Sequence, residues 1–95
     1  MHETGIVRDL ISRIVRAAHE AGASRVSGVH VWIGALTTFS PEHFRDHFEE
    51  EARGTAAEGA ALHIEPSDDT RHTQAQHVIL QRLELDVPES KDDTG

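Results

Sequence analysis

The chain has 95 residues, a length typical of one small domain, and it is 37% hydrophobic and 27% charged, a balance typical of a globular protein. Seventeen acidic against nine basic residues give a net charge of -8, which argues against a nucleic-acid partner because a phosphate backbone needs cationic contacts. The absence of cysteine excludes disulfides, thiolate metal sites and cysteine nucleophiles, so any metal ion must be held by nitrogen and oxygen ligands.

Apolar residues at helical spacing predict a first helix from Thr4 to Gly22, a glycine suited to the left-handed position just past a helix end. The apolar stripe consists of Ile6, Val7, Leu10, Ile11, Ile14, Val15 and Ala18. The next segment, residues 24–36, is rich in Val and Ile and predicts a strand. In it Val29, Val31 and Ile33 alternate with His30 and Trp32.

Ser40 followed by Pro41 predicts the start of a second helix, with the serine hydroxyl as N-cap and proline at the first helical position. Phe39 can pack on Phe44 as a hydrophobic staple, and Gly54 is expected to end the helix. Its buried face is expected to contain Phe44, Phe48 and Ala52.

Two further strands are expected in the second half of the chain, separated by a polar loop over residues 66–76. In the first strand Leu62 and Ile64 alternate with His63 and Glu65, and Pro66 closes it. In the last strand Ile79, Leu83, Leu85 and Val87 are expected on one face. Residues 89–95 are expected to form a disordered acidic tail.

This order of elements predicts an α+β fold, a two-layer sandwich with two helices on one face of a three-stranded mixed sheet, within residues 1–88. The other face of the sheet is then uncovered, and His30, Trp32 and His63 are expected on it. These three residues are candidates for partner binding, and the alternative is that they are partly shielded surface residues.

The N-terminus is the sharpest candidate metal site. The amine of Met1, the deprotonated amide nitrogen of His2 and the His2 imidazole form adjoining five- and six-membered chelate rings in one plane. Planar nitrogen coordination suits Ni(II) or Cu(II) rather than tetrahedral Zn(II). The open fourth position is left to the Glu3 carboxylate, to water or to another histidine, with His72 and His77 as candidates.

The remaining candidate motifs do not indicate a metal-binding or catalytic site. His43 and His47 share one helix face at a spacing that can bind metal, but the charged surroundings favour a solvated surface. The serines lack a nucleophile motif and no glycine-rich phosphate loop is present, so we expect no enzymatic activity. No segment approaches the roughly 20 apolar residues of a membrane span or contains a signal-peptide core, so a cytoplasmic location without membrane contact is expected.

Several segments together resemble the nickel-binding domain of the HypA/HybF family of hydrogenase maturation nickel chaperones. They are the start MHE, the first amphipathic helix, RVSGVHVWIGAL, SPEHF with Phe48 and Glu49, RGTAAEGAALHIE, and the closing RLELDV. The resemblance extends from Met1 to about Val87 and joins a metal-binding motif to a structural pattern. It implies two helices on one face of a three-stranded sheet, in agreement with the periodicity.

The resemblance also implies a function: uptake of Ni(II) by the N-terminal residues, with His2 as principal ligand, and delivery with a HypB-like GTPase to the large subunit of a [NiFe]-hydrogenase. The family has a zinc domain with two CxxC pairs between the last two strands, whereas residues 66–76 contain no cysteine, so no structural zinc is expected. The alternative is a metal-independent hydrogenase assembly protein that docks through its open sheet face.

Overall fold

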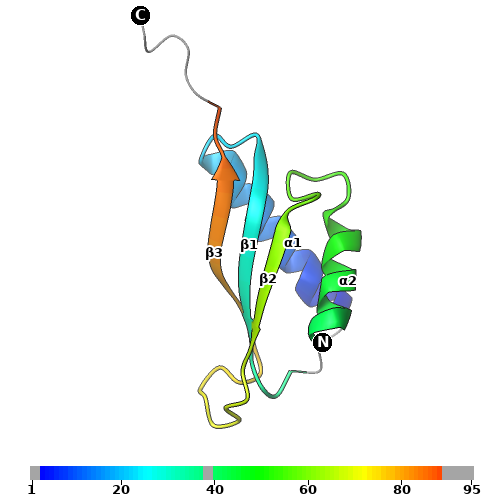
Figure 1. Cartoon of the computed structure of the whole chain (residues 1–95), viewed down its shortest axis with the longest axis vertical. Helices are drawn as coiled ribbons and strands as arrows, with labels where there is room; N and C mark the ends of the chain where they lie inside the picture. Colours follow the sequence, from blue (N-terminus) through cyan, green and yellow to red (C-terminus); the bar gives the residue numbers. More distant parts are fainter. Residues whose placement is uncertain (1–2, 38–39, 89–95) are drawn as a thin grey trace, which may run out of the picture.

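The computed structural model describes residues 3–37 and 40–88. Its elements are α1 (Glu3–Glu20), β1 (Arg25–Ile33), α2 (Pro41–Ala52), β2 (Ala61–Pro66) and β3 (Val78–Asp86), as Figure 1 shows. The sheet has the strand order β2-β1-β3, in which β2 is parallel and β3 antiparallel to β1. Both helices lie on the same face of this sheet, so the predicted α+β architecture with a mixed sheet is confirmed.

Helix α1 ends as the sequence predicts. Gly22 adopts a φ of 74°, a conformation that costs glycine little because it has no Cβ. The Ala23 N–H donates to the Ala18 carbonyl at 2.9 Å, and the Gly22 N–H donates to the His19 carbonyl at 3.1 Å. These two bonds satisfy carbonyls that the helix end leaves free. No helix in the described parts of the chain is long and apolar enough to cross a membrane.

Helix α2 begins with the predicted cap. The Ser40 hydroxyl accepts a hydrogen bond of 3.1 Å from the His43 N–H, and proline follows at the first helical position. Phe44 and Phe48 are 0% and 1% exposed, which confirms the predicted buried face. The staple residue Phe39 lies outside the described residues, as do Met1, His2 and the tail 89–95.

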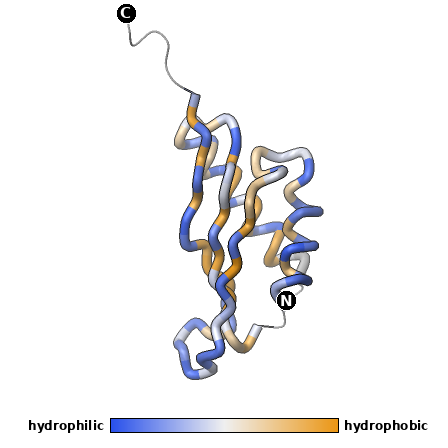
Figure 2. Tube along the Cα trace, in the orientation of Figure 1, coloured by the Kyte–Doolittle hydropathy of each residue, from blue (hydrophilic) through white to orange (hydrophobic). Residues whose placement is uncertain are grey.

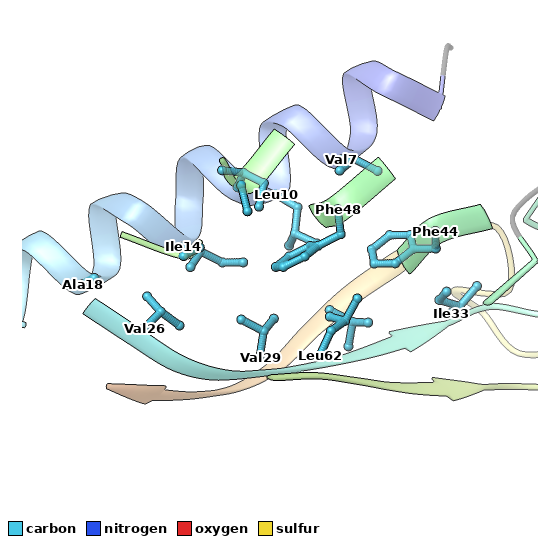
Figure 3. Packing of buried hydrophobic residues seen from close by; sticks show 14 residues of the cluster. Val7, Leu10, Ile14, Ala18, Val26, Val29, Ile33, Phe44, Phe48 and Leu62 are labelled. Carbon is cyan, nitrogen blue, oxygen red and sulfur yellow. The ribbon is translucent and has the colours of Figure 1, made fainter. Parts of the chain in front are cut away.

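The core is a single layer of apolar side chains between the helices and the sheet (Figure 3). Helix α1 contributes Val7, Leu10, Ile14 and Ala18, helix α2 contributes the two phenylalanines, and the strands contribute Val26, Val29, Ile33 and Leu62. Outside the layer, Arg8 and Glu51 join the two helices by a 3.3 Å ion pair. Among the described residues, the buried apolar cluster therefore lies between the helices and the sheet.

Two irregularities in the β1–β3 register decide which side chains reach the core. One lies between Val26 and Gly28, and it allows Val26 and Val29, three residues apart, to be buried on the same face. The other falls at Gln81, which the register skips between the pairs His30↔Arg82 and Val31↔Leu80.

The second irregularity corrects the prediction for the last strand. The side chains that pack against the core are Val78, Leu80, Leu83 and Leu85. The predicted Ile79 is instead the register partner of Trp32, on the opposite face, and Val87 lies beyond the strand and is 55% exposed. A bulge shifts the alternation by one residue, and strict alternation through the strand was therefore the wrong assumption.

The loop between β2 and β3 is polar but anchored, as the hydrophilic colour of this loop in Figure 2 and its contacts show. The Leu36 N–H donates to the Ala75 carbonyl at 2.7 Å, and the Gly34 N–H donates to the His77 carbonyl at 2.9 Å. Ala75 is 4% exposed, and a Cβ at Gly34 would collide with its backbone. Gly34 therefore permits the close approach that fixes the loop to the end of β1.

Replacing this glycine tests the anchor. We expect Gly34→Ala to lower the free energy of unfolding by about 1–3 kcal/mol, the usual cost of forcing an extra methyl into a packed site. Gly5→Ala is the matched control, because a Cβ at Gly5 meets nothing within 4 Å and alanine is the better helix former, by up to about 1 kcal/mol. Urea unfolding of the three proteins measures both effects, and equal stabilities would contradict the close approach.

Candidate metal-binding residues and the open sheet face

The predicted N-terminal nickel ligands are not visible as a site. Met1 and His2 lie outside the described residues, and for Glu3 the structure describes only its position as the first residue of α1. The described neighbourhood of this end is a groove of about 790 Å³ beside the first turns of α1. Its lining includes Gly5, Ile6 and Asp9 from the helix and His77 from the segment before β3.

His77 therefore lies next to the first turns of α1, a position that sequence reasoning left open. Its backbone is held on both sides, because its carbonyl accepts from the Gly34 N–H and its N–H donates to the Gln74 carbonyl, both at 2.9 Å. Its side chain is exposed. His77 therefore presents an exposed imidazole from an anchored backbone at the edge of this groove.

His72, the second candidate from this loop, lies elsewhere. Its ring lies against the indole of Trp32, with centroids 4.7 Å apart and planes tilted by 45°. Its Nδ1 accepts a 2.9 Å hydrogen bond from the Gln74 N–H. The structure thus separates the two loop histidines, with His77 at the groove and His72 over the sheet face opposite the helices.

The sheet face opposite the helices carries the three predicted partner-binding residues. His30 and His63 are register partners on β1 and β2, and their rings stack with centroids 4.3 Å apart and planes 11° from parallel. Trp32 follows His30 on the same face and is only partly exposed. The three side chains thus share the uncovered sheet face, as expected from the alternation along the strands.

Glu84 on β3 joins the two stacked histidines, and the sequence analysis missed it. Its Oε1 lies 3.5 Å from the Nε2 atom of His30, and its Oε2 accepts a 3.1 Å hydrogen bond from Arg82. One nitrogen each from His30 and His63 and one Glu84 oxygen lie within 4.8 Å of one another, a cluster that could hold a metal ion. Finding Glu84 required the β1–β3 register, which composition and spacing do not specify.

The helical pair His43 and His47 lies on the exposed side of α2. Their Nε2 atoms are 3.1 Å apart, and their rings meet edge to face with centroids 4.7 Å apart. Within the described parts of the chain, no carboxylate completes a three-ligand group with this pair. The pair therefore offers two ligands at most, whereas the sheet-face cluster offers three.

Comparisons with known proteins agree on one family. The family profile described as "Hydrogenase/urease nickel incorporation, metallochaperone, hypA" matches residues 1–85. The hydrogenase maturation factor HypA of Chlorobium limicola is 42% identical over 65 residues, which cover 68% of this chain and 56% of that protein. The factor HybF of Salmonella typhimurium is 35% identical over 68% of this chain and 58% of its own length.

Solved structures show the same fold. The solution structure of the Ni metallochaperone HypA from Helicobacter pylori superposes with a TM-score of 0.78 over 93% of this chain and 100% of that chain, at 21% identity. A second solution structure of a HypA protein gives a TM-score of 0.72 at 22% identity, over 90% of this chain and 96% of that one. The chain spans about half the length of the curated relatives it matches, and without cysteine it has no zinc-binding motif of the usual kind.

The placement of the two loop histidines can be read from fluorescence, because the chain contains one tryptophan. We expect His72→Ala to shift the Trp32 emission to longer wavelength, because removal of the covering imidazole exposes the indole to water. His77→Ala should leave the emission unchanged, since that side chain lines the groove at α1. Equal spectra for the two variants would contradict the separation of these side chains.

Proposed function

The chain belongs to the HypA family of hydrogenase and urease nickel-incorporation metallochaperones, and from this membership we propose that it binds Ni(II) through the nitrogens of Met1 and His2 at its Met-His-Glu start and delivers it to a [NiFe]-hydrogenase. The family is one of metallochaperones, which hold and pass on a metal ion and catalyse no reaction. The single observation that carries the proposal is the match of the family profile from residue 1 to residue 85, which includes the chelating start of the chain.

The chemistry of a helix start supports this placement. The N–H groups at the beginning of a helix have no intrahelical acceptor, and α1 begins at Glu3. The amide of His2, which precedes this helix start, can therefore release its proton to water when the metal ion binds, without the loss of a helix hydrogen bond. Together with the Met1 amine and the His2 imidazole it supplies three nitrogens in one plane, the arrangement that Ni(II) accepts and tetrahedral Zn(II) does not.

We assign the fourth position to His77 rather than to His72. The groove brings His77 beside the first turns of α1, and the backbone hydrogen bonds of His77 hold it there. His72 lies against Trp32. An imidazole in the open position completes a set of four nitrogens, which suits square-planar nickel better than a water molecule does.

The delivery step is proposed from the family alone. It places the protein in the cytoplasm with a HypB-like GTPase and the large subunit of a [NiFe]-hydrogenase as partners. The open sheet face with Trp32, His30 and His63 remains available as a docking surface in this chain.

A nickel titration of protein with a free Met1 amine tests the site. We expect one tightly bound Ni(II) per chain, with the weak absorption band of square-planar nickel, and complete loss of this binding in His2→Ala. Lowering the pH should weaken binding steeply, because the nitrogen ligands must lose protons before they bind. His77→Ala should weaken binding about tenfold or more, the scale on which a lost metal-site contact is felt.

Two controls make the result specific. His72→Ala should bind nickel like the unaltered protein, and a peptide tag before Met1 should abolish the planar site. Nickel binding that survives His2→Ala at full strength would refute the N-terminal site. The alternative of a metal-independent assembly protein makes the opposite prediction: Trp32→Ala would weaken hydrogenase binding, whereas His2→Ala would not.

A further inference from the structure

The sheet face opposite the helices contains a cluster that takes no part in the proposed coordination of nickel. His63 on β2, His30 on β1 and Glu84 on β3 each present one ligand atom, and the three atoms lie within 4.8 Å of one another. Each residue comes from a different strand of the sheet. We propose that these residues form a second, independent metal site, which binds a tetrahedral divalent ion of the Zn(II) class and links all three strands.

An unpartnered atom is the first support. The Nε2 atom of His30 is shielded from water and has no hydrogen-bond partner among the described residues. A shielded polar atom without a partner is costly, and such atoms in native proteins usually mark a role or a missing ligand. The lone pair of a neutral imidazole nitrogen is a good donor to a transition-metal ion, so a bound metal would satisfy this atom.

The arrangement of the carboxylate is the second support. The Glu84 Oε2 atom accepts from Arg82 at 3.1 Å, which leaves Oε1 directed toward His30 Nε2 at 3.5 Å. A Cβ at Gly28, the register partner of Glu84, would collide with that oxygen. Glycine at this position thus makes the space that the carboxylate occupies, and Arg82 orients the ligand from outside, as outer partners do at metal sites.

Geometry selects the class of metal. Two imidazole nitrogens and one carboxylate oxygen, with a fourth position open to water, form one of the ligand sets that zinc uses. Three ligands rising from one sheet face form a tripod below the ion, which fits three corners of a tetrahedron and not a plane. Zinc bonds of about 2.0–2.1 Å place tetrahedral ligand atoms about 3.3 Å apart, close to the present His30–Glu84 separation of 3.5 Å.

The proposed ion replaces no cysteine site and needs no residue of the N-terminal chelate. The expectation of a chain without structural zinc rested on the absence of cysteine, whereas this site uses nitrogen and oxygen only. The ligands stand on three hydrogen-bonded strands, where the backbone fixes their spacing, so little order has to be created on binding. Because the ion binds the folded sheet and not the unfolded chain, it should stabilise the fold by an amount that grows with the logarithm of the free zinc concentration above Kd.

A zinc titration in the His2→Ala background, carried out on the full chain after metal removal, tests the site without the N-terminal chelate. We expect one Zn(II) per chain by calorimetry, a rise in the melting temperature with zinc, and shifts of the His30 and His63 imidazole nitrogens in NMR spectra. Glu84→Gln and His63→Gln should each weaken zinc binding more than about tenfold and abolish the rise in melting temperature. Both positions are at least partly exposed, so these variants are expected to fold.

The double variant His43→Gln, His47→Gln is the matched control, because it removes the other close histidine pair and leaves the sheet unchanged. It should bind zinc like its parent. Zinc binding that is unaffected by Glu84→Gln and His63→Gln, or that is lost only in the helical double variant, would overturn the proposal. The zinc titrations do not test the nickel proposal, because the His2→Ala background lacks the N-terminal chelate. The nickel proposal would instead be refuted by Ni(II) binding that is unaltered in His2→Ala.

Discussion

Successive side chains of the central strand β1 face the apolar core on one side and the uncovered sheet face on the other. The rest of the structure depends on this constraint. Val29, Val31 and Ile33 face the helices and are at most 3% exposed. His30 and Trp32 lie between them in the sequence and face the other way. A slip of one residue would bury an imidazole and an indole and expose the valines, so the core fixes the position of the polar face. The alternation that packs the apolar residues of β1 against the helices therefore also places His30 and Trp32 on the opposite face.

The sequence predicts this architecture well where hydrophobic periodicity decides and fails where backbone irregularity decides. Both helices with their caps and the buried face of α2 follow from spacing and from single residues such as Ser40 and Gly22. Ile79 was assigned to the wrong face because one extra residue, Gln81, shifts the alternation along β3. No local signal at Gln81 reveals the bulge, since it arises from pairing with a strand fifty residues away in the sequence.

The candidate sites divide in the same way. The proposed N-terminal chelate can be predicted from the sequence because its ligands are adjacent along the chain and need no fold to meet. The sheet-face cluster cannot, because His30, His63 and Glu84 come together only through the register of three strands. The placement of His77 at the groove likewise depends on backbone hydrogen bonds between the loop and the end of β1. Composition and residue spacing therefore do not determine the contacts between residues that are distant in this sequence.

The two proposed sites differ in the geometry they impose, and this difference assigns the metals. Adjacent chelate rings at a chain terminus force nitrogens into a plane, whereas ligands from neighbouring strands stand on one face and enclose an ion from below. A planar site selects nickel against zinc, and a tripod accepts zinc with one position left for water. A protein that handles nickel in the presence of zinc benefits from this separation, because each geometry binds one of the two ions better than the other. The loop between β2 and β3 supports both ends of the arrangement: it directs His77 to the groove at α1 and places His72 against Trp32, on the face that carries the tripod.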